Sequence, residues 1–148
     1  MGVDPSADMC AKSLERGVAA VRAVGERLPF KDGVFDTALL INVLFLLKDR
    51  RAVLAELRRV LVPAGSLVVG ETDAATPLGR FRSELYRREL EAHGNAFLTS
   101  GELAALLREC GFFPVSVAQT LFGPPEDPAS APGGGHGRGG FVVVKALA

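Results

Sequence analysis

The sequence contains few cysteines, and none in a ligand-like arrangement. Only Cys10 and Cys110 occur among the 148 residues, and neither belongs to a CxxC pair or to a Cys/His cluster. A metal site is therefore not expected. Both cysteines fall at apolar positions of helical patterns, so we interpret them as buried thiols of a protein in a reducing compartment.

An excess of either charge is also missing. Lys plus Arg and Asp plus Glu each number 17, and the formal net charge is zero. No global field attracts the chain to nucleic acid or to an anionic membrane, so neither partner is expected. A small-molecule substrate becomes the favoured partner by elimination.

Long hydrophobic runs are absent as well. The longest apolar stretch, residues 34–47, is interrupted by Asp36, Thr37 and Asn42, and it is too short and too polar to cross a bilayer. No signal peptide precedes it, which indicates a cytoplasmic protein. With 48% apolar residues, the chain is expected to fold as one domain around a hydrophobic core.

Short apolar segments alternate with amphipathic ones in the first half of the chain. Ser6 and Asp49 are predicted to cap helices that begin just after them. The nearly continuous apolar run at 35–42 favours a central parallel strand buried on both faces. The other strands of this half are expected at 1–4, 18–24 and 66–70.

A lid-like helical insertion is expected at 74–97, with a charged helix over 78–91. Four apolar residues should lie on its inward side: Leu78, Phe81, Leu85 and Leu90. The arginines of this helix, at 80, 82, 87 and 88, either form a solvated face or bind an anionic substrate.

The C-terminal third predicts one more helix and two strands. Thr99 and Glu102 form a capping box at the start of a helix that Gly111 ends. Strands are expected at 115–122 and 141–146, and we pair them antiparallel because no helix joins them. The segment between them, 123–140, is predicted to be a Gly/Pro-rich loop.

Asp4 is the most informative single residue. It ends a short apolar strand and is followed by Pro5 and Ser6, and a carboxylate in that position suits the two hydroxyls of a ribose. The alternative role for Asp4 is to cap the helix that begins at Ala7.

Four segments with matching order and spacing extend this observation: residues 2–9, 25–30, 35–36 and 59–65. Together they resemble the class I S-adenosylmethionine-dependent methyltransferases of the type 11 branch. The resemblance implies a Rossmann-like three-layer α/β sandwich with a mostly parallel sheet and a C-terminal antiparallel strand pair. The strand order it implies is 3-2-1-4-5-7-6.

The resemblance also implies the residues that hold the nucleoside of S-adenosylmethionine, the expected cofactor. Asp4 matches the acid that binds the ribose hydroxyls, and Pro5 is placed to pack on the adenine face. Gly25 and Glu26 match the segment whose backbone contacts the adenine edge. Leu28 would close the apolar side of that pocket.

Asn42 and Val43 match the positions beside the methionine part of the cofactor and the entering substrate. Phe45 and Leu46 stand where relatives often carry histidines, so no catalytic base is identified, and the catalytic residues stay unknown. Glu71 and the nearby Asp73 are the closest acidic candidates, at the end of a predicted strand.

The matched segments begin at the second strand of the family fold, so the first strand and its glycine-rich turn are not among them. Without that strand the second and fourth strands would each have an unpaired apolar edge. We therefore expect the fold to be incomplete at the N-terminus, as the rear portion of a longer enzyme.

Three functions remain open at this point. The first is methyl transfer to a small-molecule acceptor. The second is a non-catalytic methyltransferase-like domain that stabilises or regulates a partner, for which strand exchange in a homodimer would fill the gap in the sheet. The third is a nicotinamide-dependent enzyme that uses Asp4 on a different ribose.

Overall fold

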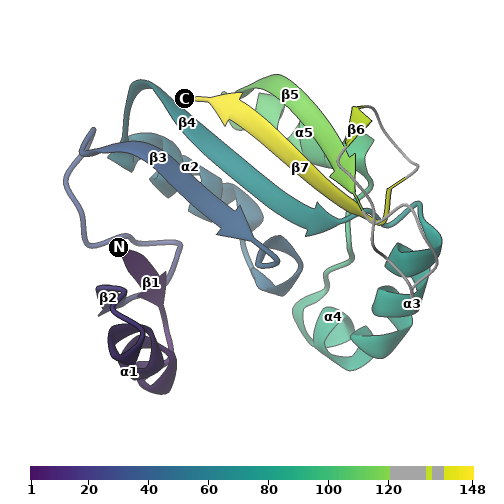
Figure 1. Ribbon diagram of the computed structural model, residues 1–148, viewed down its shortest axis with the longest axis horizontal. Coiled ribbons are helices and arrows are strands. Elements are labelled where there is room, and N and C mark those ends of the chain that lie inside the picture. Colours follow the sequence, from purple (N-terminus) through teal and green to yellow (C-terminus); the bar gives the residue numbers. More distant parts are fainter. Residues whose placement is uncertain (121–132, 135–138) are drawn as a thin grey trace.

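The computed structural model describes residues 1–120, 133–134 and 139–148, and its strands form two separate sheets (Figure 1). The smaller sheet pairs β1 (Gly2–Asp4) with β2 (Ala20–Arg22) in parallel. The larger sheet has the order β3-β4-β7-β5-β6. Its strands are β3 (Phe35–Ile41), β4 (Leu61–Thr72), β7 (Phe141–Leu147), β5 (Phe113–Thr120) and β6 (Gly133–Gly134).

The larger sheet is mixed, so the prediction of a mostly parallel sheet was wrong. β3 and β4 are parallel, whereas β7 is antiparallel to both β4 and β5, and β6 is antiparallel to β5. β5 and β7 are antiparallel neighbours, as the sequence predicted, and β7 also pairs antiparallel with β4. The order β3-β4-β7-β5 agrees with the 4-5-7-6 portion of the predicted order.

The N-terminal unit consists of β1, β2 and α1 (Ala7–Glu15). Ser6 caps α1 by accepting a hydrogen bond from the Met9 amide at 3.4 Å, as the sequence predicted. The apolar side of α1 is only partly covered, because Cys10 is buried while Leu14 is 58% exposed.

β3 is parallel to β4, as predicted, but it lies at the edge of the larger sheet and is not buried on both faces. Leu39 is 68% exposed and Ile41 is 44% exposed. Figure 1 shows α2 and α5 on the same side of the sheet. Over the described residues no helix covers the other side of β3, so the expected third layer is not seen there.

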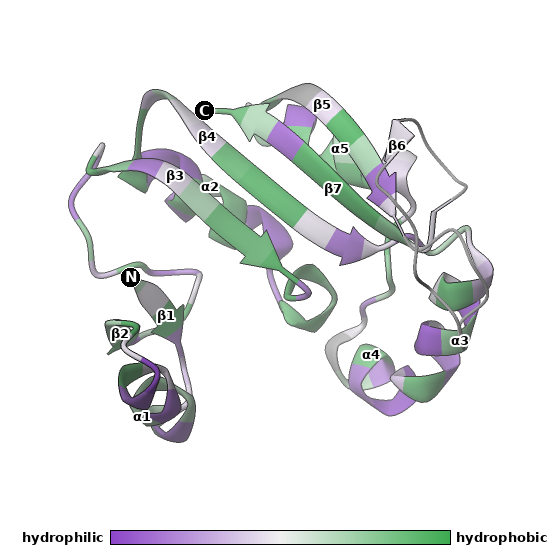
Figure 2. Cartoon of the chain, in the orientation of Figure 1, coloured by the Kyte–Doolittle hydropathy of each residue, from purple (hydrophilic) through white to green (hydrophobic). Residues whose placement is uncertain are grey.

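Two well-capped helices build the covered side. In α2 (Arg50–Val60) the Asp49 carboxylate accepts from the Ala52 amide at 2.9 Å, and in α5 (Ser100–Glu109) both bonds of the capping box are present. The core between these helices and the sheet contains fully buried side chains, among them Leu54, Leu67, Leu107, Phe112 and Val144. Figure 2 shows that the hydrophobic body of β4 ends in a hydrophilic tip.

The predicted charged helix is two helices, α3 (Pro77–Leu85) and α4 (Arg87–His93), which meet at Tyr86. Phe81 and Leu85 are 56% and 63% exposed, so their inward placement was wrong. Gly79 explains the difference. A Cβ at Gly79 would lie 2.1 Å from the Asp73 carbonyl oxygen, so the face of α3 that contains Gly79 packs on the end of β4.

In the described part of the chain no helix is long and apolar enough to cross a membrane. The predicted loop at 123–140 lies mostly outside the described residues; within it, Gly133 and Gly134 pair with β5.

Candidate functional site

The ends of β1 and β2 bring the predicted nucleoside-binding residues to one edge. Asp4 is the register partner of Arg22, and the Ala23 amide donates to the Asp4 carbonyl oxygen at 3.2 Å. The segment that contains Gly25 and Glu26 therefore begins directly beside Asp4. The carboxyl ends of parallel strands are where α/β folds bind their ligands.

The Asp4 carboxylate is oriented but only partly used. Its Oδ1 accepts from the Ser6 amide at 2.8 Å, while Oδ2 has no hydrogen-bond partner among the described residues. Ser6, and not Asp4, caps α1. One half-buried carboxylate oxygen is thus available to accept from a diol, and Pro5 beside it is exposed.

Gly25 lies where the chain crosses α2. A Cβ added there would approach the Val53 methyl carbons to 3.1 and 3.2 Å, so glycine permits this close approach. Glu26 follows it and is half-buried.

Leu28 is bound to α2 by both of its backbone polar groups. Its amide donates to Glu56 Oε2 at 2.7 Å, and its carbonyl accepts from Arg59 Nη2 at 3.1 Å. Arg59 also donates to the Phe30 carbonyl and to Asp32 Oδ1. The Arg59 bonds hold the pKa of Glu56 at about 2, well below its usual value.

The sequence did not predict this docking of residues 28–32, because it depends on a contact with a helix more than twenty residues further along the chain. Leu28 itself is buried, and its place in the wall of an adenine pocket stays a prediction.

The second group of predicted residues lies where β3 ends. Asn42 has a left-handed backbone with φ 53°, and its amide donates to the Gly70 carbonyl at 2.8 Å. Asparagine is one of the few residues that accept this conformation readily. The chain then enters a 3₁₀ turn, η1 (Leu44–Leu46).

Glu71 holds the start of this turn from the neighbouring strand. Its Oε1 accepts from the amides of Val43 and Leu44 at 2.8 and 2.7 Å. The residue is 3% exposed, and its buried Oε2 has no partner among the described residues. Burial raises the pKa of Glu71, against the opposing effects of these two amides and of Arg50 and Arg82.

Asp73, the other acidic candidate, is engaged on both oxygens. Oδ1 accepts from the Ala75 amide at 3.0 Å, and Oδ2 accepts from Gln119 Nε2 at 3.3 Å. Asp73 is fully buried, so it has a structural role at the start of α3. Of the two acids, Glu71 is the one that retains a free oxygen.

The seven predicted cofactor residues therefore form two groups. Asp4 and Pro5 lie at the end of β1, and the segment with Gly25 and Glu26 leads from the end of β2 to α2, where Leu28 is attached. Asn42 and Val43 lie at the end of β3. Figure 1 shows the small sheet beside β3 but apart from it, and no described strand lies between them.

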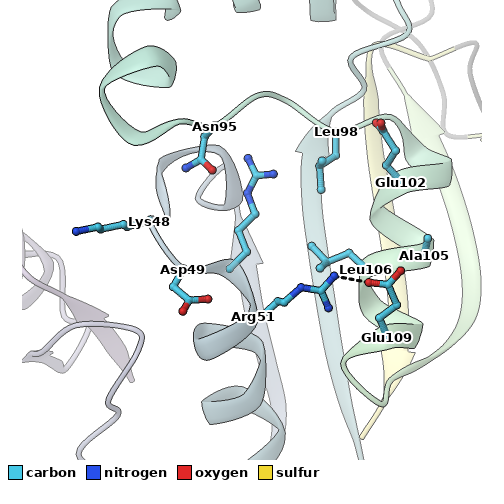
Figure 3. Close-up of a pocket in the computed structure, with 10 residues that line it drawn as sticks. Lys48, Asp49, Arg51, Asn95, Leu98, Glu102, Ala105, Leu106 and Glu109 are labelled. Carbon is cyan, nitrogen blue, oxygen red and sulfur yellow. Dashed lines mark hydrogen bonds and ion pairs between the residues drawn. The ribbon is translucent and has the colours of Figure 1, made fainter.

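A cavity of about 470 Å³ lies elsewhere, between the start of α2 and α5. Figure 3 shows that Arg51 reaches Glu109 across it, and Glu102 belongs to the capping box of α5. None of the seven residues lines this cavity. Because many of its charged groups already bond within the protein, we do not assign it to the cofactor.

The chain is similar to a solved structure from Thermotoga maritima, described as an SAM-dependent methyltransferase and possible histamine N-methyltransferase. The two share 35% identity and a TM-score of 0.89, over 99% of this chain and 72% of that one. The chain belongs to the class I S-adenosylmethionine-dependent methyltransferases. The family model described as "Methyltransferase domain" matches residues 1–69, which include all seven predicted cofactor residues.

This methyltransferase chain is also similar in sequence to two further proteins. An uncharacterised protein of Methanocaldococcus jannaschii is 32% identical over 99% of this chain and 72% of its own length. A demethylmenaquinone methyltransferase of Mycolicibacterium vanbaalenii is 37% identical over 61% of this chain and 39% of its own length. The family implies S-adenosylmethionine as the cofactor, and the oriented Asp4 carboxylate with a free oxygen fits its ribose.

Proposed function

We propose that this chain binds S-adenosylmethionine and transfers its methyl group to a small-molecule acceptor. The observation that carries the proposal is the position of Asp4 beside the segment with Gly25 and Glu26, fixed by the parallel ladder of β1 and β2. Asp4 would hold the ribose, with Pro5 and the segment from Gly25 to Leu28 around the adenine. Asn42 and Val43 would lie beside the methionine end.

The bound cofactor supplies an activated methyl group, so the protein's contribution is placement and exclusion of water. Asn42 and the turn that Glu71 holds would form one wall of the reaction site. No group in this wall needs to act as a base when the acceptor is already nucleophilic. A small-molecule acceptor is supported by the names of two relatives, a demethylmenaquinone methyltransferase and a possible histamine N-methyltransferase.

Calorimetric titration with S-adenosylmethionine, S-adenosylhomocysteine and NAD tests the cofactor. We expect binding of the first two and none of NAD. The Asp4→Asn variant keeps an acceptor for the Ser6 amide but loses the charge, so its affinity should fall roughly 10- to 100-fold, the equivalent of one charge-assisted hydrogen bond. Asp36→Asn, an exposed position on β3, is the matched control and should not change the affinity. Equal affinities for wild type and Asp4→Asn would contradict the ribose assignment.

A second candidate function, stabilising or regulating a partner protein, is favoured by the exposed Leu39 and Ile41 on the edge strand β3. A homodimer formed by strand exchange belongs to the same proposal. Absence of binding to all three ligands, together with a stable complex in light scattering, would favour this function over methyl transfer.

A further inference from the structure

The four arginines of the lid-like segment differ in their exposure and in their bonding partners. Arg80 is exposed and donates to the Ala75 carbonyl, Arg87 pairs with Glu84, and Arg88 is exposed. Arg82 alone among them is half-buried and reaches the ends of β3 and β4.

The Arg82 guanidinium is held on one side only. Its Nη1 donates to Thr72 Oγ1 at 2.7 Å and lies 3.5 Å from Asn42 Oδ1. Its central carbon lies 5.6 Å from the centre of the Tyr86 ring and 6.0 Å from that of Phe97. Nε and Nη2 have no acceptor among the described residues, and these two nitrogens form the edge with which arginine binds a carboxylate through two parallel hydrogen bonds.

The positive charge of Arg82 has no ion-pair partner within the described part of the chain. The charge of Arg82 acts to lower the pKa of Glu71, but Glu71 Oε1 is already bonded to two backbone amides. Burial also raises the pKa of Glu71, which favours the neutral acid. A half-buried cation without an ion-pair partner among the described residues, close to two aromatic rings, is suited to an anionic ligand.

We propose that Arg82 binds a carboxylate of the methyl acceptor, so that the substrate is an organic acid. This inference rests on the proposed function, since it places the acceptor beside Asn42, where the methionine end of the cofactor is assigned. Nη1 fixes the guanidinium to Thr72, and the Nε and Nη2 edge is left for the substrate. The rings of Tyr86 and Phe97 lie beside the guanidinium.

The test uses the full chain saturated with S-adenosylhomocysteine and two probes of nearly equal shape, benzoate and benzamide. We expect wild type to bind benzoate at least tenfold more tightly than benzamide. Arg82→Gln should remove this preference, Arg82→Lys should keep part of it, and Arg88→Gln, an exposed control, should keep all of it. Melting temperatures of the variants show whether each one is folded.

The other results would contradict either the role of Arg82 or the proposed function. Equal affinity of wild type for the two probes, or no detectable binding of benzoate, overturns the inference. A preference for benzoate that survives in Arg82→Gln also overturns it and leaves Arg82 as a link between α3 and β4. Failure of S-adenosylhomocysteine to bind wild type instead contradicts the proposed function itself, so the two failures are distinguishable.

Discussion

At the scale of single residues, Glu71 has a structural role that could not be predicted from the sequence. Its carboxylate joins the end of β4 to the turn after β3 through the amides of Val43 and Leu44. A buried acid with one unpartnered oxygen is costly unless it is neutral or meets a ligand. Glu71 therefore supports the shape of the proposed reaction site, and its raised pKa is a consequence of that burial.

Two substitutions of Glu71 distinguish the contribution of its hydrogen-bond acceptor to stability from that of its negative charge. Glu71→Ala leaves the buried Leu44 amide and the partly buried Val43 amide without a partner, and the free energy of unfolding should fall by roughly 2 to 4 kcal/mol. Glu71→Gln keeps a carbonyl oxygen for both amides and should cost less than about 1 kcal/mol. Urea unfolding at neutral pH measures both, with the exposed Glu89→Ala as control. A Gln variant as unstable as the Ala variant would show that the ionised carboxylate is required.

At the scale of elements, the position of α3 is determined by a glycine. Gly79 faces the Asp73 backbone so closely that no side chain fits, and this contact turns Phe81 and Leu85 outward and Arg82 inward. The close packing of α3, which carries Arg82, is thus possible because Gly79 has no Cβ.

Gly79→Ala should displace α3 from the end of β4, because the added Cβ would lie 2.1 Å from the Asp73 carbonyl oxygen. We expect a loss of roughly 1 to 3 kcal/mol of stability, as for other overpacked sites. Amide hydrogen exchange across 77–93 should become faster. Gly101→Ala in α5 is the matched control, since its nearest neighbour would be 4.0 Å away, and it should be neutral or slightly stabilising. Unchanged exchange in the Gly79 variant would show that another contact holds α3.

At the scale of the whole molecule, the larger sheet is covered on one side near β3 and open on the other. Leu39 and Ile41 point to the open side, and β3 has an unpaired edge within the described residues. Exposed apolar edge strands promote association between copies of a chain.

Leu39→Lys should therefore reduce self-association at high concentration, which light scattering over a concentration series measures. A charge on an edge strand is a common protection against pairing. Leu14→Lys, an exposed position on α1, is the control and should have a smaller effect. If both variants associate as wild type does, the open side of β3 is not the contact surface.

Much of this molecule follows from local sequence, and the rest depends on contacts between distant segments. The caps at Ser6, Asp49 and Thr99 were predicted correctly because each acts within four residues of its helix. The pairing of β5 with β7 was also predicted. The exposure of Leu39 and the bonds of Glu71 were not, since each depends on which elements pack together, and no local pattern records that.

The attachment of residues 25–32 to α2 determines what proteolysis of this segment would do to the molecule. This strap is the covalent connection between the N-terminal unit, which carries Asp4, and the larger sheet, which carries Asn42. Arg27 and Lys31 within it are exposed, and both are trypsin sites. Cleavage after Lys31 would leave the two halves of the proposed cofactor site held together by the bonds of Glu56 and Arg59 to Leu28 and Phe30, whereas cleavage after Arg27 would leave those bonds entirely within the C-terminal fragment.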